Sequence, residues 1–156
     1  MKKTVLFLLI LVTCLSVFTG CAGFKNKNAK SAFYDDCGVS VSATLSKDIL
    51  NYAELNISVK NTADKEIAAV KLYAIPQNVY GDEIDSWFAP REILYDTAIP
   101  AEGCGRFTHS FLDESVKTVT LYVYSVYFSD GTEWGDRNAK KATILKEARE
   151  VNVKVD

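Results

Sequence analysis

Apolar and polar side chains alternate with a period of two through most of the chain after residue 37. The alternation is clear in 39–45, 55–59 and 107–111 and is longest in 119–128, while 69–75 is rich in β-forming residues. Successive side chains of a β-strand point to opposite faces, so each segment has one apolar face and one wet face. Sheets of this kind are typically antiparallel. The pattern therefore predicts an all-β domain.

Turn-forming residues separate the alternating segments, at 61–65, 81–82, 100–105 and 129–131. Short strands at regular spacing, without long helical segments between them, favour a β-sandwich. The C-terminal part is less regular: 136–150 is predicted to be a short helix or an irregular cover, and 151–155 a last strand. We expect about seven strands in all.

The last long segment and its turn allow a prediction of register. A bulge near Tyr124 and Ser125 would bring the apolar side chains of this strand onto one face. Gly131 suits the left-handed position of a three-residue hairpin loop. Trp134 then falls opposite Val126 and points into the core.

The same register leaves Tyr122, Tyr124 and Tyr127 on the outer face. Tyr73 would lie beside them if the two strands are neighbours, as they are in an immunoglobulin-like order. Tyrosine is enriched at protein interfaces, so this stripe is one candidate binding surface. Aromatic pairing that only stabilises the sheet is the alternative.

Trp87 and Phe88 form a second candidate surface. They lie in 85–92, a loop or edge strand that contains Pro90. Two large aromatic side chains there would form a binding patch if exposed. Otherwise they close one end of the sandwich.

The N-terminus has the pattern of a secretory signal. Lys2 and Lys3 precede the apolar run 5–12. Even the longer stretch 5–18 is shorter than the roughly 20 residues that span a bilayer. The following 18–21, FTGC, resembles the lipobox of bacterial lipoproteins, which implies cleavage before Cys21 and a palmitate-type lipid on it. An ordinary signal peptide, with Cys21 as a bystander, is the alternative.

This interpretation divides the chain into three parts: a lipoprotein signal peptide (1–20), a lipidated cysteine with a flexible tether (21–36) and a β-sandwich domain (37–156). The product would be held on the extracytoplasmic face of the cell membrane. Loss of Lys2 and Lys3 changes the formal net charge from −2 to −4, which disfavours nucleic acid as a partner.

Two cysteines remain in the predicted domain, Cys37 and Cys104. Outside the cytoplasm such a pair can form a disulfide, and two separate buried thiols are the alternative. A metal site is not expected, because no second cysteine pair or histidine cluster accompanies them.

Motifs for catalysis are missing from the sequence. His109, the one histidine, alternates with Phe107 and Phe111, which suggests a packed or rim residue. The acids of 82–85 are expected to be solvated rather than to bind calcium. We therefore predict no catalytic residue, no metal and no cofactor.

Three segments recur together in a known group of domains: 70–84, 99–111 and 119–135, the last closed by DGTEW. In this order they resemble the FxLYD-like immunoglobulin-like domains of Firmicutes surface lipoproteins, although Ala74 replaces the Asp of that signature. The resemblance implies an immunoglobulin-like fold and a surface location, with no catalytic motif to transfer. We expect a non-enzymatic interaction module for a protein or cell-wall partner; the alternative is a small-ligand or glycan binder with an aromatic site.

Overall fold

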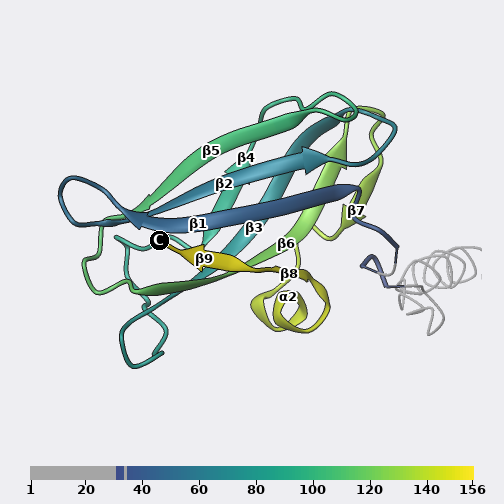
Figure 1. The fold of residues 1–156 in the computed structure, drawn as a ribbon. Helices are drawn as coiled ribbons and strands as arrows, with labels where there is room; N and C mark the ends of the chain where they lie inside the picture. The colour runs from purple at the N-terminus through teal and green to yellow at the C-terminus, as the bar shows by residue number, and fades with distance from the viewer. Residues whose placement is uncertain (1–30, 34) are drawn as a thin grey trace, which may run out of the picture. The chain divides into compact units, whose positions relative to one another are not determined.

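The computed structural model describes residues 31–33 and 35–156, and Ser31–Asp156 form one compact unit. Two sheets pack face to face (Figure 1). The first sheet has the order β5 (Cys104–Phe111), β2 (Ala53–Asn61), β1 (Val39–Lys47) and β9 (Val153–Val155). The second has the order β4 (Glu92–Tyr95), β3 (Ile67–Gln77), β6 (Thr118–Phe128) and β7 (Glu133–Gly135), and β8 (Arg149–Val151) also pairs with β6.

The strand order confirms the predicted immunoglobulin-like sandwich. β1, β2 and β5 pair as strands A, B and E of an immunoglobulin domain do, and β3, β6 and β7 pair as C, F and G do. The C-terminal β9 adds to β1 in parallel. In β2, Leu55, Ile57 and Val59 are buried between the sheets, as the alternation predicts. One short helix, α2 (Lys141–Glu147), lies among the described residues.

The register predicted for the last hairpin is confirmed. The pairing of β3 with β6 passes over Tyr124, because Lys71 lies opposite Ser125 and Leu72 opposite Val123. This bulge keeps the apolar side chains on both sides of it in the core. Gly131 has a φ of 85°, in the left-handed region that favours glycine.

Trp134 is a core residue, as predicted. It lies opposite Val126 and is 8% exposed. Its indole N–H donates to the backbone carbonyl of Asp35 over 2.8 Å, so the buried polar atom is satisfied. The ring of Phe33 meets Trp134 edge to face, with 5.3 Å between ring centroids.

The structure corrects the predicted domain boundary. Residues before 37 were assigned to a tether, but those from Ser31 on dock against the domain. Besides Phe33, Ser31 donates a hydrogen bond to Glu147 over 2.6 Å, and Asp36 pairs with Arg149 at 3.1 Å. The compact unit therefore includes residues from Ser31, and the rest of the predicted tether, like Cys21 and the predicted signal, lies outside the described residues.

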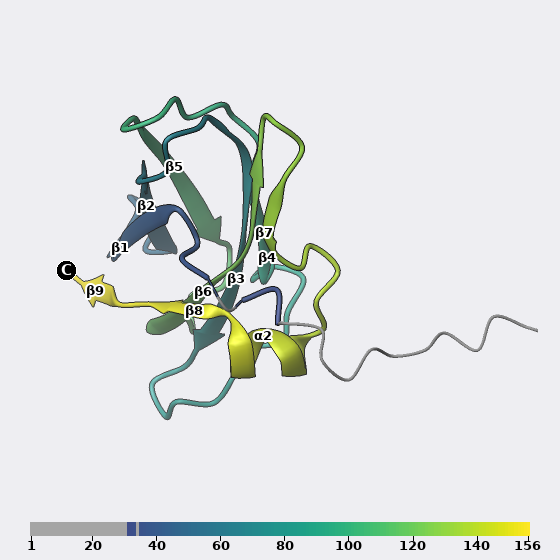
Figure 2. The same cartoon turned by 90° about the vertical axis from the view of Figure 1, so that its right-hand side faces the viewer.

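The predicted outward stripe of tyrosines is not an exposed surface. Tyr73 and Tyr124 are buried with Ile75 and Ile144 of α2 in a small second core outside the second sheet. Figure 2 shows α2 beside this sheet. Burial raises the pKa of Tyr124 to about 12, and the negative charge of the nearby Glu92 adds a smaller contribution in the same direction. The protein's own C-terminal segment thus occupies this face.

The two tyrosines that flank this second core are half-buried. Tyr122 packs against it, and the Arg137 guanidinium lies over the ring of Tyr127, 4.7 Å from its centroid. Neither belongs to an open apolar surface. Within residues 31–33 and 35–156, no helix is long and apolar enough to cross a membrane.

The predicted disulfide between Cys37 and Cys104 is wrong in this structure, where both thiols are free. Cys104 lies opposite Lys60, which lies opposite Ser40, so Cys104 is two strands away from the β1 residue in its row. Two strand spacings are about 9.6 Å, beyond the Cα separation of about 7 Å that a disulfide tolerates. Cys37 lies three residues before Ser40 in the sequence. It is buried, and its thiol donates a hydrogen bond to the Val39 carbonyl.

The two thiols should react very differently. In the full-length chain without reductant, we expect iodoacetamide to alkylate the exposed Cys104 in the folded state and Cys37 only after denaturation. Peptide mapping by mass spectrometry reads each site separately. Recovery of a Cys37–Cys104 linked peptide would contradict the structure.

Candidate functional site

The strand directions bring several chain segments to one end of the sandwich. The connections 48–52 and 112–117 follow β1 and β5, which end together beside β2, and 78–91 begins where β3 pairs with the start of β6. β9 runs parallel to β1 and ends there too. We call residues 47–52, 78–91, 112–117 and 155–156 the loop end; the segment that leads into β1 enters at the opposite end (Figure 1).

Exposed apolar side chains concentrate at the loop end. Of the ten large apolar side chains that are exposed among the described residues, eight lie there: Ile49, Leu50, Val79, Tyr80, Trp87, Phe88, Leu112 and Val155. Ile49 is 100% and Trp87 98% exposed. Single exposed apolar residues are ordinary, but a group at one end of a domain is typical of an interaction site.

The turn at 48–52 shows how the sequence holds such side chains in water. The Asp48 carboxylate accepts hydrogen bonds from the backbone N–H groups of Leu50 and Tyr52, both at 2.9 Å. Asn51 takes the left-handed conformation, with φ 69°, and its N–H donates to the Asp48 carbonyl. The local polar bonds therefore fix the backbone, and Ile49 and Leu50 project outward.

A second turn, at 78–82, repeats this arrangement. The Asn78 side-chain oxygen accepts hydrogen bonds from the N–H groups of Tyr80, at 2.9 Å, and Asp82, at 3.0 Å. Gly81 takes the left-handed position with φ 84° and donates to the Asn78 carbonyl. Val79 and Tyr80 occupy the two outward positions. We call 48–52 and 78–82 the apolar turns.

A turn at the other end of the sandwich gives a comparison. In 128–132 the N–H of Gly131 donates to the Phe128 carbonyl and the N–H of Phe128 to the Thr132 carbonyl, as in the apolar turns. Its two outward residues, however, are Ser129 and Asp130. This backbone thus accepts polar residues at its tip, so turn geometry does not explain the apolar pairs at the loop end.

Trp87 and Phe88 project from a third turn. The N–H of Ala89 donates to the Ser86 carbonyl over 3.0 Å, and the N–H of Phe88 contacts the Ser86 hydroxyl at 3.2 Å. Ala89 is buried and anchors the turn. The sequence left open whether these aromatics are exposed or close the sandwich; the structure shows both exposed.

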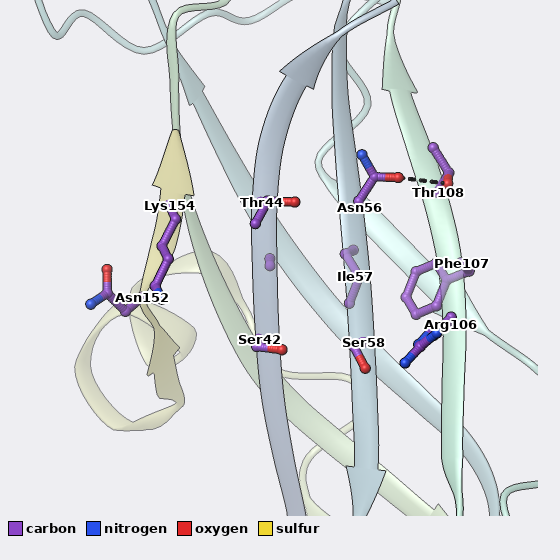
Figure 3. Close-up of a pocket in the computed structure, with 11 residues that line it drawn as sticks. Ser42, Thr44, Asn56, Ile57, Ser58, Arg106, Phe107, Thr108, Asn152 and Lys154 are labelled. Atoms are coloured by element: carbon purple, nitrogen blue, oxygen red, sulfur yellow. Dashed lines mark hydrogen bonds between the residues drawn. The ribbon is translucent and has the colours of Figure 1, made fainter. Parts of the chain in front are cut away.

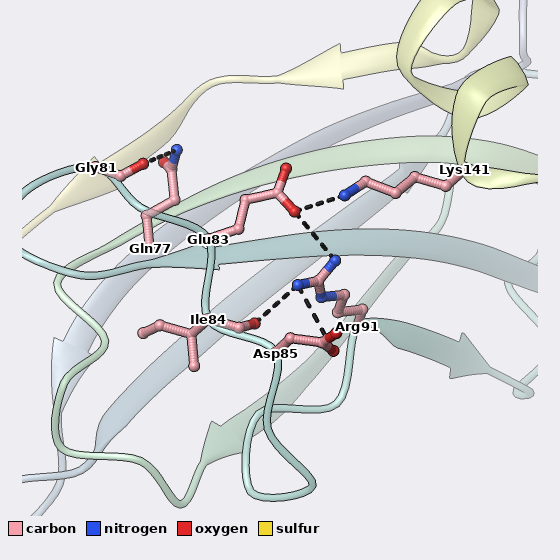
Figure 4. Close-up of polar contacts among 7 residues, drawn as sticks. All are labelled: Gln77, Gly81, Glu83, Ile84, Asp85, Arg91 and Lys141. Carbon is pink, nitrogen blue, oxygen red and sulfur yellow. Dashed lines mark hydrogen bonds and ion pairs between the residues drawn. The ribbon is translucent and has the colours of Figure 1, made fainter.

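Arg91 fastens the base of this loop (Figure 4). Its guanidinium donates to the Ile84 carbonyl over 3.0 Å and pairs with Glu83 at 3.2 Å and Asp85 at 3.8 Å. Glu83 also pairs with Lys141 of α2 at 2.5 Å. These contacts, led by the bond from Lys141, hold the pKa of Glu83 below its usual value. The predicted solvated acids are thus partly engaged in ion pairs that position the loop.

Polar contacts also join the three loops to one another. The N–H of Lys117 donates to the Gln77 carbonyl over 2.8 Å, which holds the end of 112–117 beside the start of 78–91. Hydrogen bonds from the hydroxyl and the backbone N–H of Ser115 lower the pKa of Asp113. Lys47 lies beside Lys117, and its pKa is lowered by desolvation first and then by that neighbouring positive charge. The three loops are therefore neighbours at this end of the sandwich.

Acidic residues surround the apolar side chains of the loop end. The loop end contains seven acidic residues and three basic ones, a formal net charge of −4, whereas the whole chain has −2. One of the three basic residues, Arg91, is occupied by its own loop. This charge disfavours anionic lipid and nucleic acid as ligands of this surface.

His109 lies beside the loop end, on the inner face of the edge strand β5. Its ring meets Phe111 edge to face at 4.8 Å, and its Nε2 lies 3.3 Å from the Pro90 carbonyl oxygen. This arrangement agrees with the predicted packed or rim position. Burial lowers the pKa of His109 more than the Pro90 hydrogen bond raises it.

Sequence reasoning found only Trp87 and Phe88 of the loop end. It missed the apolar turns, although each pair follows an Asp or Asn and precedes an Asn or Gly, residues that form turns. An apolar pair between two such residues, in the connection between two strands, is the signal that would have found them.

Comparisons with known proteins give similarity of fold only. No protein-family model matches the chain, and no curated protein matches it in sequence. A solved structure of a DUF1425 family member from Shewanella sp. pv-4 is similar with a TM-score of 0.45 and 13% identity, over 55% of this chain and 75% of that one. The structural genomics target SoR45 has a TM-score of 0.38 and 12% identity, over 65% and 88%.

A third similar structure is the Pseudomonas fluorescens alkylpurine DNA glycosylase AlkC, bound to DNA with an abasic site analogue. Its TM-score is 0.35 and its identity 10%, over 79% of this chain and 32% of the glycosylase. At such scores none of these similarities supports an argument about function. The sandwich assignment rests on the strand order of the chain itself.

The lowered pKa of His109 predicts a pH dependence of stability. The unfolded chain binds this proton more readily than the folded one, so the free energy of unfolding should fall as the pH decreases from about 7 to about 5. His109→Gln removes the titration and should flatten that slope, measured by urea unfolding at each pH. Ser110→Ala, on the exposed face of the same strand, should keep the wild-type slope. An equal slope in His109→Gln and wild type would contradict the assignment.

Proposed function

We propose that the protein is a lipid-anchored extracytoplasmic module that binds a protein partner through its loop end, without catalysing a reaction. The observation that carries this proposal is the concentration of exposed apolar side chains on the tips of three polar-bonded loops. Maintaining such side chains in water has an unfavourable hydration free energy, which association with a partner removes. The apolar turns supply four of them on fixed backbones.

The acidic residues around the apolar tips indicate the chemistry of the partner. A surface that carries basic side chains around an apolar hollow would match the acidic loop end in charge and shape. A large aromatic residue such as Trp87 is typical of the side chains that dominate binding energy. The well-bonded turns limit the ordering entropy that binding must overcome.

The anchor is proposed from the sequence. The FTGC motif supports lipidation of Cys21, and the resemblance to FxLYD-like domains supports a place among bacterial surface lipoproteins. The described segment before β1 enters the sandwich at the end opposite the loop end (Figure 1). The partner would then be another protein of the cell envelope or its surroundings.

The anchor has a direct test with a matched control. Cells that express the full-length chain and take up an alkyne analogue of palmitate should label the wild type. Cys21→Ser should lose the label, while Cys14→Ser, a cysteine within the predicted signal, should keep it. Label retained by Cys21→Ser would overturn the proposed anchor and leave the loop end untouched.

The loop end is tested by substitution of its tips. Ile49→Ser and Trp87→Ser should reduce capture of the partner by at least roughly tenfold, because truncating a central aromatic anchor commonly costs 2 kcal/mol or more. Leu94→Ser is the matched control, since Leu94 is an exposed apolar residue of β4 outside the loop end. Capture is measured by quantitative cross-linking of the full-length chain in its membrane.

Unchanged unfolding midpoints for these variants would show that they fold, as expected for exposed positions. If Leu94→Ser reduced capture of the partner as much as Ile49→Ser and Trp87→Ser do, the assignment of binding to the loop end would be contradicted. Cross-linking to lipid rather than to protein would contradict the proposed class of partner.

A further inference from the structure

The outer face of the first sheet has no cover among the described residues, unlike that of the second sheet. A groove of about 470 Å³ runs over its central strands (Figure 3). Its outward side chains belong to β1, β2, β5 and the segment of β9. Most are short and carry hydroxyl or amide groups.

Two rows of side chains cross this face. The pairing places Ser42 opposite Ser58, and Ser58 opposite Arg106. Asn152, just before β9, lies at the far edge from Arg106 (Figure 3). Small hydroxyl groups therefore occupy the middle of this row, and a cation stands at one edge.

The second row runs beside the first with its cation at the other edge. Lys154 lies opposite Thr44, Thr44 opposite Asn56, and Asn56 opposite Thr108. The Thr108 hydroxyl donates to the Asn56 side-chain oxygen over 3.1 Å, and the Asn56 amide donates to Ser46 over 3.1 Å. These bonds fix the orientation of the central amide.

The charge of the groove is opposite to that of the chain. None of its lining residues is acidic, while Arg106 and Lys154 are basic, in a protein whose formal net charge is −2. On an ordinary wet sheet face, opposite charges pair across strands. Here neither cation forms an ion pair with another residue of the described part of the chain. Both are available to an anionic ligand.

The two cations are too far apart to hold one small anion. Three strand spacings and one two-residue step separate their Cα atoms by about 16 Å. A ligand that reaches both must carry anionic groups at intervals, with polar groups between them that face the hydroxyl-rich centre. Phe107, the aromatic residue of the lining, belongs to the inward row of β5 and stacks on Tyr95 with 4.5 Å between ring centroids, so the outward side chains offer no aromatic platform of the kind that commonly lines ligand sites. This favours a flexible chain over a stacked sugar ring.

We propose that this groove binds a linear polyol-phosphate chain. Arg106 receives one phosphate through the planar donor fork of its guanidinium, and Lys154 receives a later one as a point charge. Ser42, Ser58 and Thr44 exchange hydrogen bonds with the polyol between them. This site is separate from the loop end, so it does not depend on the protein partner proposed above.

The test is titration of the detergent-solubilised full-length chain with fluorescent poly(glycerol phosphate), followed by polarisation. Wild type should bind, and Arg106→Gln with Lys154→Gln should weaken binding by roughly tenfold or more, since each charge-assisted bond contributes about 1.5–3 kcal/mol. Lys140→Gln with Lys146→Gln removes the same charge at α2, away from the groove, and should bind like wild type. Both pairs are exposed, so equal unfolding midpoints are expected.

Three results would overturn the proposal. One is the absence of binding to poly(glycerol phosphate) by wild type. Another is an equal loss in both double variants, which would show general charge attraction rather than a site. The third is equal or tighter binding of polygalacturonate or neutral dextran, which would assign the groove to a carboxylated or an uncharged glycan instead.

Discussion

Burial on both faces of β6 is the constraint on which the rest of the structure depends. The bulge at Tyr124 keeps the apolar side chains before and after it in the core between the sheets, and the opposite face of β6 contributes to a second core. Val123 and Val126 stay between the sheets, while Tyr124 turns into the second core with Ile144. The outer face of the second sheet is then apolar and needs a cover, which α2 and Phe33 provide.

This cover determines which surfaces remain open. Both ends of the described chain pack beside the second sheet. Ser31 bonds to Glu147 of α2, and β8 pairs with β6 before the chain crosses to the first sheet, where β9 pairs with β1. The outer face of the first sheet and the loop end have no comparable cover among the described residues. The first is basic and rich in hydroxyl groups, and the second is acidic with apolar tips, so they suit ligands of different chemistry.

The sequence predicted what depends on local pattern. Alternation identified the main strands, and the bulge with Gly131 placed Trp134 opposite Val126, because register follows from the periodicity of one hairpin. A short helix or an irregular cover was expected in 136–150, but its packing on Tyr124 through Ile144 was not predictable, because a seven-residue helix has no strong signal of the face that it covers. The Cys37–Cys104 pairing failed for a related reason: Cys37 precedes β1 and Cys104 begins β5, and spacing in the sequence does not show how many strands lie between them.

The loop tips show why hydrophobic periodicity alone does not identify every candidate binding surface. Ile49–Leu50 and Val79–Tyr80 interrupt the alternation only briefly, and each pair follows closely on a strand of similar apolar composition. What distinguishes these pairs is the turn beneath them, which Asp48 and Asn78 hold by side-chain bonds to the backbone. Because the same backbone carries Ser129 and Asp130 at the opposite end, the apolar choice is a property of position in the molecule. The turn geometry does not require these side chains at the tips, and their exposure is the observation from which the binding role is proposed.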